Sequence, residues 1–520
     1  MSVATVVVTP MLVALVAAVS TLLTGRWPRL QTALSLAGVL AYAAAVAALS
    51  RAVLAGGVLT YQVGRWPAPF GISLVADALS AFMLSLAAVV AVASLVFSVR
   101  YVDPYGQRLS YHALFHFMLL GVSGAFLTGD VFNLFVWFEV MLMSSYVLVV
   151  FYSGPEQTSA ALRYVVLNLL GSAVMLVAIG GLYATTGTLN MADIARRIAD
   201  PGAYGVAVGP VLGLSAVLFA VFALKAGVVP FQFWVPAAYR AAPSPVAAML
   251  AGVVKKVGVY AMVRLLFTVL AGADLAVRLG PLSGGMLAFY APVLLTMAAA
   301  SILLGGVGAA SRDSLPDVLS YSSISQVGFV VLPVGVAAAT AGSVRTLAVV
   351  AALVYALNHA LSKGLLFLVT GVVRDATGAE EFAKLGGLAG RFPWLAAAFF
   401  VGALALVGIP PLAGFFGKLL VFDAAVRAGA TAALGVALFG AVLTIAYYTR
   451  AWNLGFWGEQ TPLVEGATAD EVQVAVCVAL ALAVVAVGLG FDPVYRFAAA
   501  GARAALDSQG YVTAVLGGGA

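Results

Sequence analysis

Long apolar segments dominate this chain, and they constrain its fold more than any other feature of the sequence. A helix needs about 20 apolar residues to cross the ~30 Å hydrocarbon core of a bilayer. Because that core offers no water to unpaired backbone groups, each spanning segment must be a helix. Such segments begin near Val3, Gln31, Val75, Tyr111, Val131, Arg163, Gly209, Ser244, Met286, Leu315, Val344, Trp394, Gly429 and Val472. We therefore predict an all-α polytopic membrane protein with about 14 transmembrane helices.

Composition narrows the possible functions. With 63% hydrophobic and 9% charged residues, the chain lies far outside the range of soluble globular proteins. Its net charge of +6 is spread over short loops rather than gathered in one patch, so we expect no nucleic-acid partner. Cys477, the only cysteine, excludes an intrachain disulfide and a cysteine-ligated iron–sulfur cluster. We expect no cofactor in this chain, so that any redox chemistry would belong to another chain.

Lysine and arginine are segregated along the sequence. The arginines fall in loops or at segment ends, whereas all lysines but one lie inside apolar segments. A cation at mid-bilayer costs about 2.5–3.5 kcal/mol, and lysine can release its proton there while arginine cannot. This pattern favours proton handling over the alternative that arginine has merely replaced lysine in the loops. The lysines within apolar segments are Lys225, Lys255, Lys256, Lys363 and Lys418.

The middle of the chain contains an internal repeat. Three pairs of segments match in the same order: 139–145 with 317–323, 168–176 with 358–366, and Lys225 with Lys418. Such repeats are common in transporters, whose sites lie at the repeat interface. We divide the chain into N-terminal helices (1–110), a first five-helix repeat (111–270), a second five-helix repeat (286–458), and a last span with a tail (472–520).

Prolines mark two spans as discontinuous. Pro230 and Pro236 follow Lys225, and Pro410 and Pro411 precede Lys418. Proline removes a backbone donor and breaks a helix, and the exposed backbone is tolerated only beside a cavity or within protein. A lysine next to a broken helix is well placed to bind water and to exchange protons. A simple packing kink would also explain the prolines.

Other titratable residues lie inside the spans. Glu139 has no compensating charge nearby in sequence, so we expect it to form an ion pair with Lys225, either for transport or as a static structural pair. His359 and Lys363 are four residues apart and share a helix face, which suits a proton relay, although His359 could be a satisfied core residue.

Lys255 and Lys256 point about 100° apart, so at most one of them faces a given axis squarely. We choose Lys256. In chain order the groups expected to form a proton axis are Glu139, Lys225, Lys256, His359, Lys363 and Lys418.

Further residues stand outside this axis. His112 and His116 have no carboxylates nearby at a spacing that would complete a metal site. We therefore expect the two histidines to lie near a proton entrance rather than to bind a metal. Asp77 could be a helix cap, a subunit contact or a relay member, and Asp317 could pair with Arg312.

Shorter segments complete the sequence. Residues 190–200 predict a short interfacial amphipathic helix, and the tail after residue 492 predicts a frayed surface segment. The loop containing Arg374, Lys384 and Arg391 is the richest in basic residues, which favours a cytoplasmic side for it and an external side for both termini.

Several motifs resemble those of one known family. They are Trp137–Met141, Lys225–Pro236, Pro243–Val246, Lys256–Tyr260, Ser322–Gly328, Asn358–Lys363 and Gly408–Lys418. These residues resemble the antiporter-like subunits shared by complex I, membrane-bound hydrogenases and Mrp antiporters, over roughly residues 70–455. The motif at Lys256 and the preceding Ala-Ala-Pro-Ser-Pro are most similar to the D-type branch of Mrp-type sodium/proton antiporters.

The resemblance implies both a fold and a function. It implies a fourteen-helix fold with two inverted five-helix repeats and two discontinuous helices. It also implies that the six residues of the axis match the family's proton-pathway positions. The chain would belong to a heteromeric complex of membrane subunits in a bacterial cell (inner) membrane, which moves H⁺ inward and exports Na⁺. No cofactor is implied, and the sequence locates no sodium or other metal site.

Two alternatives remain open. The same proton axis would serve the proton-pumping arm of a redox-driven complex, of the NADH:quinone oxidoreductase or membrane-bound hydrogenase type. A membrane scaffold without transport is the third possibility, which the buried lysines oppose. As part of an antiporter, the protein would be a secondary transporter and not an enzyme.

Overall fold

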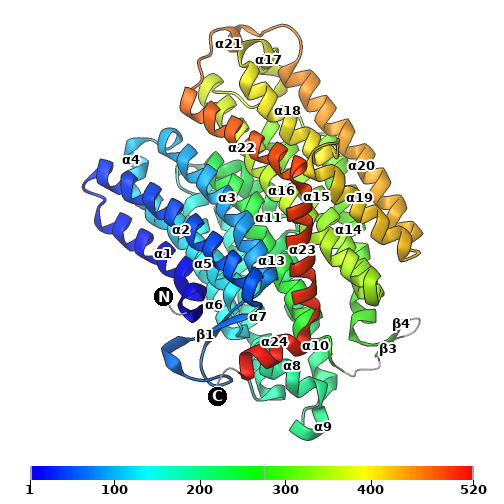
Figure 1. The fold of residues 1–520 in the computed structure, drawn as a ribbon. Coiled ribbons are helices and arrows are strands. Elements are labelled where there is room, and N and C mark those ends of the chain that lie inside the picture. Colours follow the sequence, from blue (N-terminus) through cyan, green and yellow to red (C-terminus); the bar gives the residue numbers. More distant parts are fainter. Residues whose placement is uncertain (1–2, 274–276, 280–281, 518–520) are drawn as a thin grey trace.

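The computed structural model describes residues 3–273, 277–279 and 282–517 and consists mainly of long, closely packed helices (Figure 1). Twelve of the described helices are long and apolar enough to cross a membrane. Two shorter apolar helices, His112–Leu127 and Pro393–Val407, lie among them. The expectation of an all-helical, multi-pass membrane protein is therefore confirmed, apart from two small β-hairpins. The exact count of 14 spans stays a prediction.

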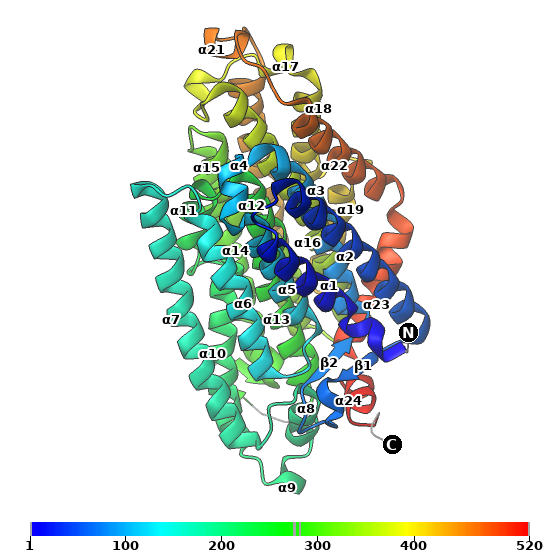
Figure 2. The ribbon, with the colours of Figure 1, turned by 90° about the vertical axis from the view of Figure 1, so that its left-hand side faces the viewer.

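The N-terminal part contributes three long helices and one hairpin. These elements are α1 (Val3–Leu23), α2 (Pro28–Gly56), β1 (Leu59–Gln62), η1 (Val63–Arg65), β2 (Ser73–Ala76) and α3 (Ala78–Tyr101). Strands β1 and β2 pair antiparallel, with Leu59 opposite Ala76. Helix α1 packs on both α2 and the later helix α5, so the N-terminal helices form one side of the bundle (Figure 2).

The next part holds the first predicted repeat. Its elements are α4 (Pro104–Gly106), η2 (Gln107–Tyr111), α5 (His112–Leu127), α6 (Val131–Val149), α7 (Pro155–Thr186), α8 (Met191–Ala199), α9 (Pro201–Tyr204), α10 (Val208–Ala226), α11 (Trp234–Ala241), α12 (Ser244–Met249), η3 (Leu250–Val254), α13 (Lys255–Val263) and η4 (Arg264–Val269). The elements from α12 to η4 form one continuous span, Ser244–Val269, which is completely enclosed by its neighbours.

The second predicted repeat and the C-terminal part follow. After the hairpin β3 (Val277–Leu279) and β4 (Leu282–Gly284) come α14 (Met286–Ala310), α15 (Leu315–Ala339), α16 (Gly342–Thr377), η5 (Phe382–Lys384), α17 (Leu388–Arg391), α18 (Pro393–Val407), α19 (Ala413–Arg427), α20 (Thr431–Ala451), η6 (Trp452–Phe456), α21 (Pro462–Glu465), α22 (Glu471–Leu489), α23 (Phe491–Leu506) and α24 (Ser508–Leu516). Helices α15 and α16 are mostly buried and form the centre of the molecule.

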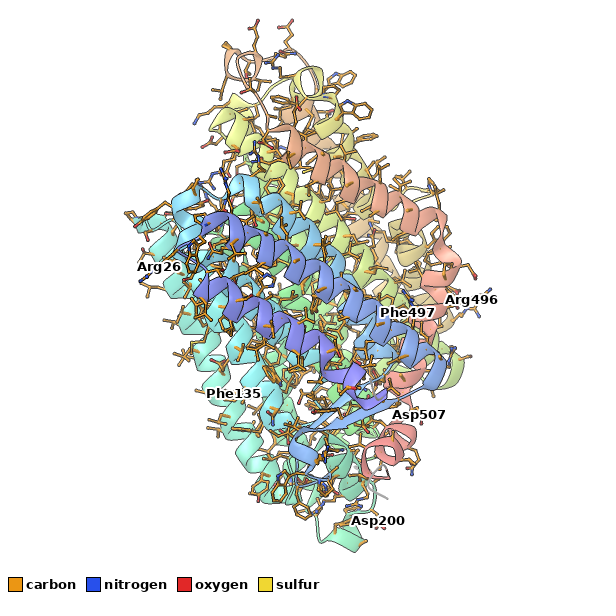
Figure 3. All side chains as sticks on the ribbon, turned by 60° about the vertical axis from the view of Figure 1, so that its left-hand side comes forward. Arg26, Phe135, Asp200, Arg496, Phe497 and Asp507 are labelled. Carbon is orange, nitrogen blue, oxygen red and sulfur yellow. The ribbon has the colours of Figure 1, made fainter. Side chains whose placement is uncertain are left out.

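The tail after residue 492 was expected to fray, and this expectation is wrong for the residues up to 516, whereas residues 518–520 lie outside the described part of the chain. Residues 491–516 form α23 and α24, and α23 packs against α3 and α16. Phe497 of α23 is labelled in Figure 3. Its ring packs edge to face on that of Phe82, with 5.3 Å between the ring centroids. Small residues at helical spacing, Ala498, Gly501 and Ala505, let α23 approach its neighbours closely.

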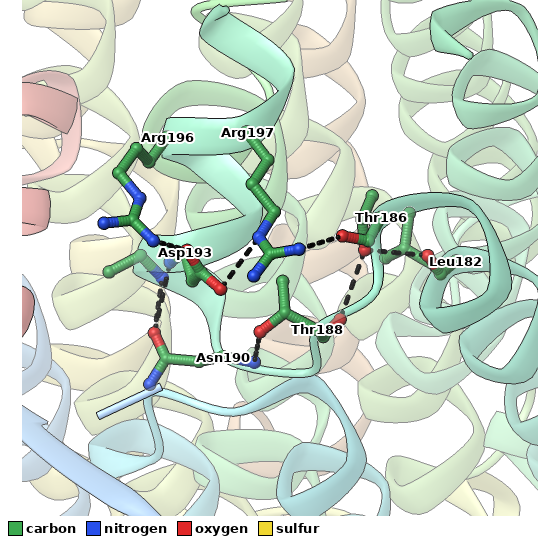
Figure 4. A network of polar contacts seen from close by, with 8 residues as sticks. Leu182, Thr186, Thr188, Asn190, Asp193, Arg196 and Arg197 are labelled. Carbon is green, nitrogen blue, oxygen red and sulfur yellow. Dashed lines mark hydrogen bonds and ion pairs between the residues drawn. The ribbon is translucent and has the colours of Figure 1, made fainter. Parts of the chain in front are cut away.

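The expected short amphipathic helix is present as α8. Asn190 caps its N-terminus, and buried Asp193 binds Arg197 at 3.0 Å and also Arg196 (Figure 4). Arg197 donates to the carbonyl of Thr186 at 3.0 Å, which ties α8 to the end of α7. The start of α1 and helix α24 lie near the same end of the bundle in Figures 1 and 2.

Candidate functional site

Lys225 and Glu139 meet at a hydroxyl that a third helix provides. Lys225 lies in the last turn of α10 and is 3% exposed. Its ammonium donates to Ser172 Oγ of α7 at 2.8 Å and to the carbonyl of Asn168 at 3.0 Å. Ser172 in turn donates to Oε1 of Glu139 on α6. One serine hydroxyl therefore accepts from the lysine and donates to the carboxylate.

The expected direct ion pair between Glu139 and Lys225 is thus replaced by a bridged contact. Helix α7 packs against both α6 and α10, so a side chain of α7 lies between the two charged groups. Glu139 is half-buried, whereas Lys225 is enclosed. Ser172 was not predicted from the sequence, although its spacing of four residues from Asn168 places both on one face of α7.

The helix is discontinuous after Lys225, as the prolines predicted. Gly227 ends α10 with a left-handed φ of 65°. The freed backbone groups find partners in nearby side chains. Trp234 Nε1 donates to the carbonyl of Leu224 at 2.8 Å, and the amide of Val229 donates to Ser301 Oγ at 3.0 Å. The irregular backbone is therefore covered by protein, as a membrane interior requires.

Two further lysines bind adjacent serines of α15. Lys255 of α13 donates to the carbonyl of Ser323 at 3.0 Å and to its hydroxyl at 3.2 Å. Lys363 of α16 donates to Ser322 Oγ and, at 3.2 Å, to the hydroxyl of Tyr448 on α20. All five residues are buried. The serine pair of the Ser322–Gly328 motif thus joins two lysines from different helices.

Lys255 also faces the break between α10 and α11. A Cβ atom at Gly227 would lie only 3.9 Å from Lys255 Nζ. Helix α13 can come this close because Gly258 has no side chain; a Cβ there would lie 2.6 Å from the carbonyl oxygen of Phe222. Lys255 therefore lies between the break that follows Lys225 and the serine pair of α15.

Lys256, the lysine chosen from the sequence, is oriented differently. Its ammonium donates at 2.9 Å to the carbonyl of Ala251 on its own span. Both ring nitrogens of His359 lack a hydrogen-bond partner within the described residues, so the expected relay to Lys363 has no direct bond.

Lys418 lies beyond the second break. Gly408 ends α18 with a φ of 93°, and α19 carries Lys418 back to the end of α18. There the ammonium donates to the carbonyl of Val407 at 3.0 Å and lies 4.9 Å from the ring centroid of Phe329. A cation is favoured at a helix C-terminus, where the free carbonyls carry partial negative charge.

Asp77 acts as a helix cap, which was one of its expected roles. Its Oδ1 accepts from the amide of Ser80 at 2.9 Å, and its own amide donates to Ser80 Oγ, so the two residues form a capping box. Asp77 also forms an ion pair of 2.7 Å with Arg264, and both side chains are nearly inaccessible. The sequence analysis missed this partner because the two residues are far apart in the chain.

The expected pair between Asp317 and Arg312 is wrong. Asp317 binds Arg240 of α11 at 3.1 Å. The Arg312 guanidinium instead lies over the ring of Tyr321, 4.3 Å from its centroid.

Metal binding finds no support in the described part of the chain. Residues 3–273, 277–279 and 282–517 contain no group of three or more His, Cys, Asp or Glu that could hold an ion. His112 and His116 neighbour Gln107 and Ser35 rather than carboxylates. The arrangement suits proton transfer better, because a serine or tyrosine hydroxyl can accept from one neighbour and donate to the next.

Known proteins resemble this chain in sequence and structure. The family described as "NADH:quinone oxidoreductase/Mrp antiporter, TM" matches residues 128–444. The D-type Na(+)/H(+) antiporter subunit of Alkalihalophilus pseudofirmus is 36% identical over 467 residues, which are 89% of this chain and 90% of that relative. The N-type NADH-quinone oxidoreductase subunit of Desulforudis audaxviator is 35% identical over 411 residues, 78% of this chain and 77% of that one. A chain in the structure of the Mrp complex from Dietzia sp. superposes with a TM-score of 0.88 at 28% identity, covering 99% of this chain and 100% of that chain.

Proposed function

The chain belongs to the antiporter-like subunit family of NADH:quinone oxidoreductases and Mrp antiporters, and from this premise we propose that it is the proton-translocating subunit of a multisubunit sodium/proton antiporter. Protons move along a buried axis, and their movement drives the export of Na⁺ by the complex. The residues of the axis are Glu139, Lys225, Lys256, His359, Lys363 and Lys418, with Lys255 added on structural grounds.

The bridge from Lys225 through Ser172 to Glu139 carries this proposal. A proton can leave the ammonium for the serine oxygen while the serine proton passes to the carboxylate. The transfer leaves lysine and glutamic acid neutral, which suits a low-dielectric interior better than separated charges. Once the glutamic acid has released its proton onward and the neutral lysine has taken up another, the charged pair is restored and the bridge can carry the next proton.

Lys255 extends the axis from the first repeat to the second. Its ammonium reaches Ser323 on one side and lies beside Gly227 on the other. The neighbouring Ser322 accepts from Lys363, so the two lysines are separated by adjacent serines. This geometry supports Lys255 as the crossing point between the two repeats. Beyond Lys363, the axis continues to Lys418 at the second break.

The half-buried position of Glu139 supports packing against another membrane subunit. A carboxylate exposed to lipid is costly, so the outer face of α6 and α7 needs a cover. Leu162, Leu170 and Val177 make the exposed part of α7 apolar, so this face is compatible with lipid as well as with the apolar side chains of another subunit. We place the complex in a bacterial cell membrane, because the relatives are bacterial.

Transport by variants of the whole complex tests this proposal. In everted membrane vesicles, Glu139→Ala and Lys225→Ala should each abolish sodium-dependent proton movement, measured with a pH-sensitive dye, while the complex still assembles. Lys384→Ala is the matched control, because Lys384 is an exposed loop lysine. Wild-type transport by both axis variants would refute the proposal.

A redox-driven proton pump is the second candidate, favoured by the similarity to the quinone oxidoreductase subunit. The proton axis is the same in both cases, so the partner chains decide between them. Gentle purification of the tagged complex, followed by identification of its chains and assay of flavin and iron, separates the two. Stoichiometric flavin or iron–sulfur subunits would establish the redox complex, and their absence together with small hydrophobic partners would establish the antiporter.

A further inference from the structure

A second set of buried polar side chains lies between α5 and the first two helices. Its members occupy one face of α5 and one face of α2. On a helix with 3.6 residues per turn, His112, His116 and Ser123 point within about 40° of one another. We call this set the α5 column; its residues are Ser35 and Tyr42 of α2, Gln107 before α5, and His112, His116 and Ser123 of α5.

The outer half of the column contains two side-chain contacts to histidine rings. Near the outer end, Gln107 Oε1 lies 3.5 Å from His112 Nε2. One turn further, the hydroxyl of Ser35 shares a hydrogen bond of 3.0 Å with His116 Nε2. Helix α2 leaves room for this imidazole because a Cβ at Gly38 would lie 3.3 Å from its Cε1 atom.

The inner end of the column is a hydrogen bond between two hydroxyls. Tyr42 and Ser123 lie 2.9 Å apart and are both inaccessible. From His112 to Ser123 the column follows α5 for about 17 Å, roughly half of a bilayer. Polar contacts thus lead from a helix end to the middle of a span.

The two histidines are poorly explained as core packing. Both are 0% exposed, and Nδ1 of each lacks a hydrogen-bond partner in the described part of the chain. A neutral imidazole has one donor and one acceptor nitrogen, and a buried polar atom left unused costs about 1–3 kcal/mol. Apolar residues would fill the same space without that cost, and ionisable residues within membrane spans generally mark ion or proton paths.

The column leads toward the central lysines. Ser123 is followed within one turn by Phe126, whose carbonyl accepts from the hydroxyl of Tyr260 at 2.8 Å. Tyr260 lies four residues after Lys256 and therefore on the same face of α13. Lys255 and Lys363 bind the serines of α15, whereas the ammonium of Lys256 binds the carbonyl of Ala251. At the opposite end, Gln107 is only partly buried and adjoins the short surface helix α4.

We propose that the α5 column is a proton inlet, which leads from the aqueous side at α4 to Lys256. The inference rests on the proposed function, because it supplies protons to the same axis. A proton from water binds one imidazole nitrogen, and the other nitrogen releases a proton to the next group. The hydroxyls of Ser35, Tyr42 and Ser123 each accept one proton and donate another. No residue is consumed, and water fills the gaps between the groups.

Cysteine accessibility tests the inlet without using transport. Cys477 is the only cysteine, so Cys477→Ala removes all thiols from this chain. In that background, Ser35→Cys and Ser123→Cys place isosteric thiols in the column. Ala125→Cys is the matched control, because Ala125 is buried on the opposite side of α5. The assembled complex in sealed vesicles is exposed to Ag⁺ on one side, then unfolded, and the remaining thiols are tagged with a polymer-linked maleimide.

Opposite outcomes are expected for the column and the control. Both column thiols should bind Ag⁺, with release of the thiol proton. Their labelling by the maleimide should therefore decrease at least about ten-fold faster with time of Ag⁺ exposure than that of the control thiol. Equal protection of all three thiols would overturn the proposal. Failure of the axis itself would appear differently, as wild-type transport by Glu139→Ala and Lys225→Ala with the accessibility of the column unchanged.

A second experiment tests whether the accessible column conducts protons. Tyr42→Phe removes one hydroxyl, and His116→Leu removes one imidazole of similar volume. Each should slow sodium-dependent proton movement about ten-fold or more, since loss of a positioned proton-transfer group costs at least that much. Wild-type rates in both variants would overturn the inlet even if Ag⁺ reaches the column.

Discussion

At the scale of single residues, three of the five buried lysines bind hydroxyl groups on neighbouring helices. Lys225, Lys255 and Lys363 each donate to a serine oxygen. A serine hydroxyl costs little free energy within a helix, so serines occur in many apolar segments and do not stand out in a sequence. A lysine in an apolar segment is rare and does stand out. The cations of the site were therefore predictable, while the hydroxyl groups that join them, such as Ser172, were not.

Ser172→Ala should separate Lys225 from Glu139. The change removes a single oxygen atom, which accepts from the ammonium and donates to the carboxylate. We expect sodium-dependent proton movement to fall about ten-fold or more, as for loss of a positioned proton-transfer group. Dye measurements in everted vesicles check this. Ser145→Ala, which removes a buried hydroxyl bound to Tyr164, is the control and should transport normally.

Lys418→Arg should impair transport although the charge is kept. An arginine cannot release its proton in a protein, so a group that must alternate between charged and neutral forms would stop working. The initial rate of sodium-dependent proton movement is the measurement, and Lys384→Arg in the exposed loop is the control. A normal rate for Lys418→Arg would mean that Lys418 acts as a fixed charge.

At the scale of helices, the two breaks bring the lysines to their partners. Each break has prolines and a left-handed glycine, Gly227 or Gly408, and each carries a lysine within a few residues. Proline is visible in any sequence, so both breaks could be predicted. The tail was misjudged because its small residues, Ala498 and Gly501, give little hydrophobic signal, although they allow close packing.

Gly227→Ala should destabilise the first break. The left-handed φ of 65° costs a residue with a Cβ about 1–2 kcal/mol. The new Cβ would also lie 2.5 Å from Val235 Cγ2, which forces a local shift. We expect a lower melting temperature of the purified complex.

Gly213→Ala is the matched control in the middle of α10. No atom lies within 4 Å of its added Cβ, and its backbone is helical. Alanine is favoured over glycine there by about 1 kcal/mol, so the melting temperature should stay the same or rise slightly. Equal melting temperatures for the two variants would show that the break tolerates a side chain.

At the scale of the whole molecule, one buried arginine, Arg264, connects three distant parts of the chain. Asp77 caps α3, Arg264 begins η4, and the Arg264 guanidinium lies 5.1 Å from the ring centroid of Tyr511 in α24. Contacts of this kind join segments far apart in the sequence, so periodicity and spacing cannot show them. The inverted relation between the two repeats also stays a prediction, which the family resemblance implies.

Asp77→Asn should therefore destabilise the molecule far more than an ordinary charge removal. Asparagine keeps an oxygen for the amide of Ser80, but it leaves the buried Arg264 without a negative partner. Removing one partner of a buried pair costs about 3–5 kcal/mol, so the melting temperature of the purified complex should fall clearly. Asp423→Asn breaks the exposed pair with Arg427 and should change stability by at most about 1 kcal/mol. Similar melting temperatures for both variants would mean that Arg264 finds another partner, and that the ion pair does not hold the N- and C-terminal parts together.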